Sequence, residues 1–235
     1  MKTLTIRLTS PLQSYGNEAS FGRRTTGDYP SKSAVAGMIA AAMGYGRDDH
    51  RILDLNDLKF AVRIDQPGKV LTDFHTVEWK KDTRKITYRD YLQDAVFVVA
   101  IGSEDAVIDE IKLALKRPHY PIFLGRRSNV PAGLLHLEEF PDDTPVSVLK
   151  KLNWQASQWH QKRLKKEETV SVEVISDANL LPKTRNSLVK DRVVSFDQRN
   201  RQHGFRAVAT IHVDLKNPYF QEKKADTQHD IMNFL

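Results

Sequence analysis

The chain has 235 residues, 40% of them hydrophobic, and its 36 Lys and Arg against 30 Asp and Glu give a formal net charge of +6. This composition excludes a disordered chain and allows one large domain or two small ones with real cores. The absence of cysteine excludes disulfides, thiolate chemistry, iron–sulfur clusters and cysteine-ligated zinc, and favours a reducing, cytoplasmic compartment. No apolar run approaches the length that a bilayer needs, so no membrane partner is expected.

The first part of the chain predicts four strands and two helices. Alternating or continuous apolar residues indicate the strands, and apolar residues at helical spacing indicate the helices. In chain order these are a strand at 4–8, a helix between Pro30 and Gly44 capped by Ser31 or Ser33, strands at 58–65 and 94–101, a helix at 104–116 and a strand at 134–137. The order strand, helix, strand, strand, helix, strand is that of a ferredoxin-like domain, with both helices on one side of the sheet.

A β-ribbon is expected between the second and third strands, with arms at 70–77 and 86–91. Its tip is too polar to belong to a core, because it carries Lys80, Lys81, Arg84 and Lys85. These cations, with Trp79 and Tyr88 beside them, could hold the backbone of single-stranded RNA and stack on a splayed base. An ordinary charged hairpin with an aromatic pair across its strands explains the same residues equally well.

Residues 138–145 are acidic and contain two prolines, which predicts a boundary. The chain would then divide into a ferredoxin-like domain at 1–140 and a region at 141–235 that holds a helical linker and a smaller β-rich domain. The expected strands of this second region lie at 170–175, 193–196 and 205–215, around a charged turn at 198–204. Seven Lys and Arg against two Asp give residues 183–206 a local charge of +5, which favours a polyanionic partner.

The loop at 123–133 combines glycine with adjacent arginines. Gly125 lets backbone N–H groups approach a ligand closely, and Arg126 and Arg127 offer bidentate donors that suit a phosphodiester. In a ferredoxin-like order this loop shares one edge of the sheet with the loop after the first strand and with the N-terminus of the first helix, itself an anion site. A solvated turn remains the alternative reading. The candidate phosphate contacts at this edge are Gln13, Arg23, Arg24, Lys32, Ser33, Arg126 and Arg127.

Catalysis has little support in the sequence. A metal-independent ribonuclease would need a general base, for which His75 and His119 are the available residues, and a lone histidine is more often a bystander. No HExxH, clustered carboxylate motif, histidine pair at ligand spacing or G-x-S-x-G elbow occurs. We therefore expect no catalytic residue, no metal, no cofactor and no small-molecule substrate.

Six segments in order along the chain carry motifs of a known family, at 8–16, 24–37, 73–77, 89–95, 124–128 and 195–197. They resemble the CasD subunits of the type I-E CRISPR surveillance complex, Cascade, which form part of the Cas-five family in the RAMP superfamily. The resemblance covers most of the chain up to residue 130 and becomes sparse through the tryptophan-rich middle.

The resemblance implies a non-catalytic, RRM-like RNA-binding protein. Its glycine-rich loop and a thumb-like ribbon at about 70–92 would hold the hooked 5′ handle of the CRISPR RNA. It would cap the filament between the first backbone subunit and the large subunit that reads the PAM, and meet target DNA only indirectly. Because a sister subtype uses its counterpart as the processing ribonuclease, cleavage of the repeat RNA stays open as the alternative.

Carried onto this chain, the resemblance assigns handle contact to matching positions in the loops, the first helix and the ribbon. These positions are Gln13, Arg24, Lys32, Ser33, His75, Arg126 and Arg127, with Gly125 and Ser128 in the same arginine-rich loop. Lys80, Lys81 and Arg84 follow from the ribbon alone. Asn129 is assigned no role.

Overall fold

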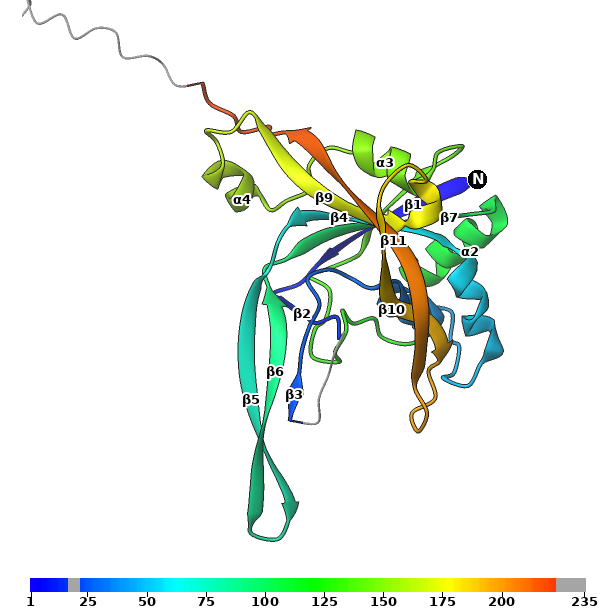
Figure 1. Cartoon of the computed structure of the whole chain (residues 1–235), viewed down its shortest axis with the longest axis vertical. Coiled ribbons are helices and arrows are strands. Elements are labelled where there is room, and N and C mark those ends of the chain that lie inside the picture. The colour runs from blue at the N-terminus through cyan, green and yellow to red at the C-terminus, as the bar shows by residue number, and fades with distance from the viewer. Residues whose placement is uncertain (17–21, 223–235) are drawn as a thin grey trace, which may run out of the picture.

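The structure is a computed structural model that describes residues 1–16 and 22–222 (Figure 1). It has an α+β, sheet-rich fold. The strands of its main sheet are β1 (Lys2–Thr9), β4 (Lys59–Gln66), β7 (Val96–Ser103), β8 (His136–Phe140), β9 (Thr169–Asp177), β10 (Asn186–Ser195) and β11 (Gln202–Lys216). They pair antiparallel in the order β10-β11-β9-β4-β7-β1-β8.

Helices cover both faces of this sheet. The helices are α1 (Lys32–Ala42), α2 (Asp105–Lys116), α3 (Pro145–Lys151) and α4 (Gln158–Arg163), and the short 3-10 turns are η1 (His50–Ile52), η2 (Asp54–Asp57) and η3 (Ala178–Leu180). Phe97 and Val99 of β7 belong to the cluster that contains the apolar side chains of α1 and α2, whereas Val98 and Ala100 pack with α3. The two faces of β7 are therefore both buried, which explains its continuous apolar sequence.

The helix α1 begins and ends where its sequence indicates. The Ser31 side chain accepts a hydrogen bond from the backbone N–H of Ala34 at 3.2 Å, which satisfies one of the free donors of the first turn. After the last turn, Gly44 adopts φ +78°, a left-handed conformation that favours glycine. Of the two serines that the sequence offers as caps, Ser31 is the one used.

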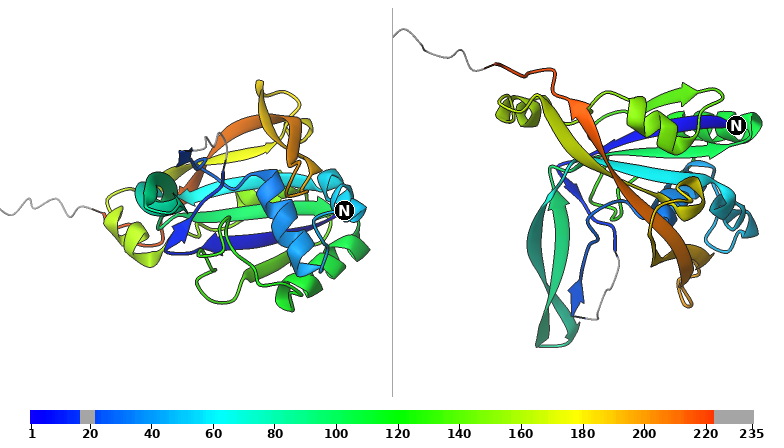
Figure 2. Two further views of the ribbon diagram at one scale, coloured as in Figure 1. Left: turned by 90° about the horizontal axis from the view of Figure 1, so that it is seen from below. Right: turned by 45° about the horizontal axis from the view of Figure 1, so that its top comes forward.

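A long ribbon projects from the body of the protein (Figures 1 and 2). It consists of β5 (Lys69–Lys80) and β6 (Thr83–Gln93), longer than the arms that the sequence predicts. The short strands β2 (Leu12–Gln13) and β3 (Arg23–Arg24) pair with the inner half of β6, β2 at its base and β3 near its middle, and complete a second, four-stranded sheet. Beyond the inner half the two arms pair only with each other.

The boundary predicted near residue 140 does not interrupt the main sheet. β9, which follows the boundary, pairs with β4, which precedes it. Strands from both sides of the boundary therefore lie in one sheet, and the division into two domains stays a prediction. Within the described residues, no helix is long and apolar enough to cross a membrane.

Four buried charged groups join α1 to the last three strands. Lys32 Nζ lies 3.3 Å from Asp177 at the end of β9, and Arg206 of β11 lies 2.7 Å from both Asp177 and Asp191. Asp191 of β10 also accepts a hydrogen bond of 2.9 Å from the backbone N–H of Lys32, in the first turn of α1. The exposed fractions of these side chains are only 8 to 11%. We call these four residues the buried ion cluster.

Removing one member of the buried ion cluster should destabilise the fold. Asp191→Ala leaves Arg206 without its bidentate partner and the first turn of α1 without an acceptor, so we expect it to lower the free energy of unfolding by about 3 kcal/mol. Lys151→Ala, which breaks the exposed pair with Asp143, serves as the control and should cost less than about 1 kcal/mol. Urea unfolding of both variants measures the difference, and equal costs would contradict a stabilising role for the cluster.

Candidate nucleic-acid interface

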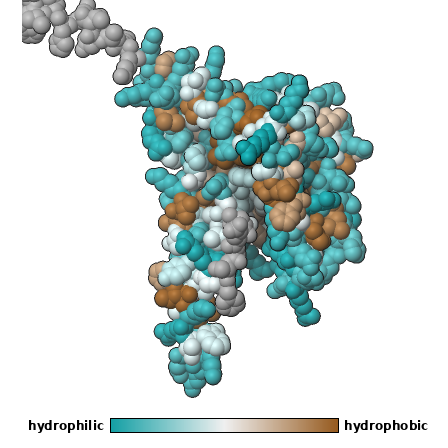
Figure 3. Space-filling view, in the orientation of Figure 1, coloured by the Kyte–Doolittle hydropathy of each residue, from teal (hydrophilic) through white to brown (hydrophobic). Residues whose placement is uncertain are grey.

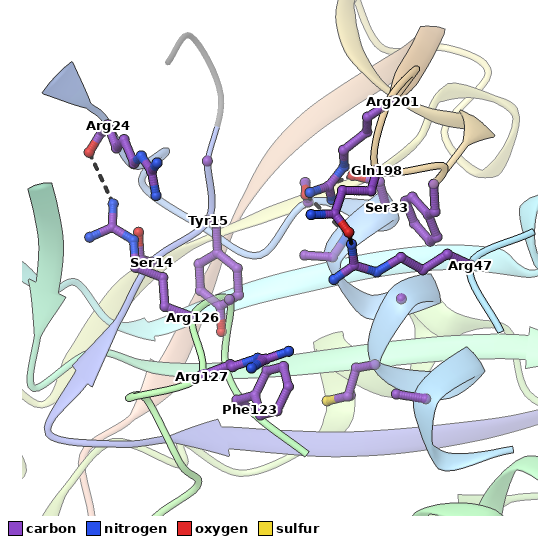
Figure 4. Close-up of a pocket in the computed structure, with 18 of the residues that line it drawn as sticks. Ser14, Tyr15, Arg24, Ser33, Arg47, Phe123, Arg126, Arg127, Gln198 and Arg201 are labelled. Carbon is purple, nitrogen blue, oxygen red and sulfur yellow. Dashed lines mark hydrogen bonds between the residues drawn. The ribbon is translucent and has the colours of Figure 1, made fainter. Parts of the chain in front are cut away.

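An open cleft of about 1860 Å³ lies between α1, the loop that precedes β8, the β5–β6 ribbon and the turn between β10 and β11 (Figure 4). Among the described residues its lining contains no Asp or Glu. The basic side chains of the lining are Arg24, Arg47, Lys85, Arg89, Arg126, Arg127 and Arg201. A concave surface with cations and no carboxylate concentrates positive potential and suits a polyanion.

The arginine-rich loop is held tightly against the segment that follows β1. Gly125 has φ +93°, and a Cβ atom added there would lie 1.6 Å from the carbonyl oxygen of Ser14. The backbone N–H of Ser14 donates to the carbonyl of Leu124 at 3.2 Å. Both the backbone angle and the close approach require glycine at position 125.

Asn129 closes the same loop. Its side chain donates to the carbonyl of Leu124 at 3.3 Å, and its backbone N–H donates to the carbonyl of Arg126 at 2.9 Å. Ser128 donates its hydroxyl to the Asn129 side chain at 3.0 Å and does not line the cleft. Asn129 is buried, so it shapes the loop that presents the arginines.

Three arginines meet beside the inner half of the ribbon. Arg126 lies over the ring of Tyr91, with its Cζ atom 4.4 Å from the ring centroid, and donates from Nη2 to the carbonyl of Arg24 at 3.0 Å. Arg24 is the register partner of Arg89 in the parallel pairing of β3 with β6. Within the described residues, Arg126 Nη1 and Arg89 Nε are buried without a hydrogen-bond acceptor. Unsatisfied buried donors are unfavourable, so an anionic acceptor that reached them would stabilise this arrangement.

The structure brings together only part of the set that the sequence indicates. The members that line the cleft are Arg24, Ser33, Gly125, Arg126 and Arg127. Arg23 is turned toward Asp90 of β6, with Nε 3.1 Å from the carboxylate, and hydrogen bonds from Arg23 and Thr72 hold the pKa of Asp90 below its usual range. Arg23 thus fastens β3 to the ribbon.

Gln13 and Lys32 lie inside the protein and outside the cleft lining, so their contact with RNA stays a prediction that the geometry of the free chain does not favour. The Gln13 side chain is fully buried; it donates to the carbonyl of Ala95 at 2.8 Å and accepts from the Tyr15 hydroxyl at 2.7 Å. Burial lowers the pKa of Lys32, whose amine faces Asp177. Both side chains serve the fold: Gln13 holds Tyr15, which lines the cleft, and Lys32 anchors α1.

On the ribbon, the alternation of side chains decides which residues face the cleft. The residues of β5 and β6 that line it are Val77, Trp79, Lys85, Thr87 and Arg89. Tyr88 points to the other face, where it pairs with Phe74. Three of the predicted contacts are exposed at the outer end of the ribbon, outside the lining: Lys80, Lys81 and Arg84. The fourth, His75, also lies outside the lining, with its Nε2 atom 3.1 Å from the Asp73 carboxylate. RNA contact by these four stays a prediction.

Phe196 lies in the family motif at 195–197, but the sequence did not indicate that it forms a wall of the cleft with Arg47, Gln198, Arg201 and His203. The basic excess of residues 183–206 was a signal for Arg201, but it did not indicate that the turn faces α1. Arg47 carries no such signal, because it is one charged residue in a short loop after a helix. Only the packing of the β10–β11 turn beside α1 makes these residues neighbours.

The protein has an α+β fold, a projecting β-ribbon and a basic cleft whose lining, among the described residues, contains no carboxylate; this combination suits a polyanion. Residues 3–209 match the family described as CRISPR-associated protein (Cas_Cas5), and the chain belongs to this family.

Individual relatives agree with this assignment. The chain is 36% identical to the CRISPR system Cascade subunit CasD of Escherichia coli (strain K12) over 146 residues, which are 53% of this chain and 65% of that protein. The match therefore spans less than two thirds of the relative. A chain of a solved CRISPR RNA-guided surveillance complex is 31% identical with a TM-score of 0.74, and the match covers 99% of this chain and 98% of that one. A solved Cas protein is 30% identical with a TM-score of 0.66, with coverage of 94% and 98%.

Substituting Gly125 should disrupt the loop that presents Arg126 and Arg127. Gly125→Ala adds a clash with the Ser14 backbone to the cost of its left-handed backbone, whereas Gly133→Ala, at φ +92° with nothing within 4 Å, carries the backbone cost alone. We expect Gly133→Ala to cost about 1 kcal/mol and Gly125→Ala clearly more. Urea unfolding and amide hydrogen exchange of residues 123–129 compare the two; equal effects would show that the contact with Ser14 is unimportant.

Proposed function

We propose that this protein is a non-catalytic RNA-binding subunit of a type I-E CRISPR Cascade complex. It holds the 5′ handle of the CRISPR RNA in the basic cleft and caps the backbone of the complex next to the large subunit that reads the PAM. The observation that carries the proposal is the cleft itself, whose lining joins seven Lys and Arg side chains without an Asp or Glu among the described residues. The family and the relatives named above supply the biological context.

The arrangement of strands supports a ferredoxin-like, RRM-like reading of residues 1–140. The strands β4, β7, β1 and β8 are adjacent in that order in the sheet, and α1 and α2 cover one face. When these four strands are numbered in the order in which they occur along the chain, their spatial order in the sheet is 2-3-1-4. The ribbon inserted between the second and third strands then acts as the thumb, and residues 141–235 form the smaller β-rich unit.

Single-stranded RNA fits the cleft better than a duplex does. Arginines can hold phosphates bidentately, and exposed aromatic faces can stack on bases that a single strand leaves open. Trp79 is 70% exposed on the cleft side of the ribbon, next to Lys85. The tip of the ribbon thus offers a stacking surface beside a cation.

Partner subunits would cover apolar side chains that the isolated chain exposes. Figure 3 shows such side chains over the ribbon, among hydrophilic ones. On the face away from the cleft, Phe74 is 64% exposed and Ile86 is 51% exposed. Exposed apolar groups gathered on one element mark protein contact, so the back of the ribbon is where we place a neighbouring subunit of the complex.

The two bases that the sequence offers lie outside the cleft. His75 and His119 do not line it. His203 does line it, and Lys85 and three tyrosines of the lining are groups that can transfer protons, so the non-catalytic assignment rests on the family context and on the cleavage test below.

Replacing both loop arginines should weaken RNA binding and its salt dependence. Each phosphate contact releases counterions, with a slope of about 0.7 per contact on single strands, so Arg126→Ala with Arg127→Ala should lower the slope of log K against log salt by up to about 1.4. Lys116→Ala with Arg117→Ala removes the same charge at the end of α2, outside the cleft, and should change neither quantity appreciably. Fluorescence anisotropy with handle RNA over a salt series measures both, and an unchanged slope in the loop variant would count against the proposal.

Incubation with CRISPR repeat RNA in EDTA tests the ribonuclease alternative. We expect no defined cleavage product from the wild-type protein. A product that accumulates with wild type and disappears with His75→Ala, His119→Ala or His203→Ala would overturn the non-catalytic assignment.

A further inference from the structure

We propose that Arg47 and Arg201 form a second phosphate-binding site, on the wall of the cleft opposite the arginine-rich loop, so that one RNA strand is held at two separate points across α1. This inference rests on the proposed function and adds a contact that the handle-binding residues named so far do not include. We call this wall, formed by Arg47, Phe196, Gln198, Arg201 and His203, the far wall.

The far wall is built from two distant parts of the chain. Arg47 lies in the loop after α1, and Gln198 and Arg201 lie in the turn between β10 and β11. Arg47 Nη1 donates to Gln198 Oε1 at 3.2 Å, which joins the two parts. Figure 4 shows Arg47, Gln198 and Arg201 together on one side of the cleft, and Arg24, Arg126 and Arg127 on the other.

Phe196 fixes the position of the Arg201 head group. The Arg201 Cζ atom lies 5.3 Å from the centroid of the Phe196 ring, a distance at which a cation and an aromatic face attract. The same ring lies against α1, 3.5 Å from where a Cβ atom on Gly37 would be. Arg201 is held by the Phe196 ring and Arg47 by the Gln198 amide. Both side chains therefore lose little conformational entropy when they bind, which favours tight recognition of an anion.

The charges of the far wall lack a counter-charge. Within residues 1–16 and 22–222, neither Arg47 nor Arg201 forms an ion pair, whereas Arg51 nearby pairs with Asp49 at 2.6 Å. Partial desolvation by the surrounding protein, followed by the like charge of Arg47, lowers the pKa of Arg201. Two neighbouring cations repel each other in the free protein, so a bound phosphate would relieve a repulsion as well as add contacts.

A single strand is the ligand that can satisfy both walls at once. Phosphates recur along an RNA backbone, and the cleft is continuous from Arg126 to Arg201 with aromatic side chains between. The buried ion cluster holds β10 and β11 on α1, so the distance between the walls is fixed by the fold. A strand that spans α1 therefore meets two preformed phosphate sites, with its bases free to face the aromatic lining.

The test compares two double variants of equal charge. Arg47→Gln with Arg201→Gln removes the far-wall cations. Arg51→Gln with Arg199→Gln removes the same formal charge outside the cleft lining, from η1 next to the Arg47 loop and from the β10–β11 turn. With handle RNA we expect the first pair to weaken binding at least about tenfold and to lower the salt slope, while the control pair stays near wild type. Circular dichroism and the urea midpoint show whether each variant is folded.

The length of the RNA separates this inference from the proposed function. Binding of a strand too short to reach both walls should be weakened by Arg126→Ala with Arg127→Ala but not by the far-wall variant. Above a defined RNA length, the far-wall variant should weaken binding as well.

If long RNA binds the far-wall variant as it binds the control variant, while the loop variant binds poorly, the second site is wrong and the proposed function stands. If neither variant weakens RNA binding, the proposed function itself falls. If the far-wall variant keeps RNA but loses binding to a polyglutamate peptide, the wall is an acidic-protein contact and the inference is overturned.

Discussion

The buried ion cluster is the interaction on which the shape of the cleft depends. Asp191 is bound both to the first turn of α1 and to Arg206, and Asp177 is bound to Lys32, Arg206 and the backbone N–H of Phe60 on β4. These bonds link α1 to four strands. Burying four charges has a large desolvation cost, and only complete pairing offsets it. The cluster therefore tolerates one arrangement, in which α1 forms the floor and the β10–β11 turn forms one wall.

Four Asp side chains of the described residues are buried in ion pairs, and the other acidic side chains among those residues lie outside the cleft lining, which leaves the cleft positive. Asp65 pairs with Arg63 where both side chains are fully buried, and Asp90 of the ribbon strand β6 pairs with Arg23 of β3. Burial raises the pKa of Asp65 even against the hydrogen bonds and charge of Arg63, so this pair contributes position more than stability. A formal net charge of only +6 thus produces a strongly basic surface, because acidic groups are segregated from it.

Local sequence patterns predicted correctly those features that depend on neighbouring residues alone. Alternation and cap residues located β1, β4, β7, the start of α1 at Ser31 and the ribbon, and glycine next to arginine located the loop at Gly125. The strand predicted at 134–137 was misplaced, because β8 spans His136–Phe140 and Leu134 is exposed. Such patterns failed where a side chain has two possible environments. Lys32 lies at a helix N-terminus, where an anion site is expected, yet its amine donates a hydrogen bond to the carboxylate of Asp177, 145 residues away. Arg47 and Arg201 become neighbours only through long-range packing that no local pattern encodes.

The walls of the cleft and the projecting ribbon differ in how firmly the fold holds them. The walls are fixed by buried contacts, so their arginines are held at a set spacing, and in the proposed function they would bind phosphates with little loss of conformational entropy. The outer half of the β5–β6 ribbon has cross-strand bonds alone, and a two-stranded ribbon is marginally stable by itself. Its apolar back and its aromatic front at Trp79 are both exposed. In the proposed function, RNA on the front and a neighbouring subunit on the back would both stabilise the ribbon, so that each contact would favour the other.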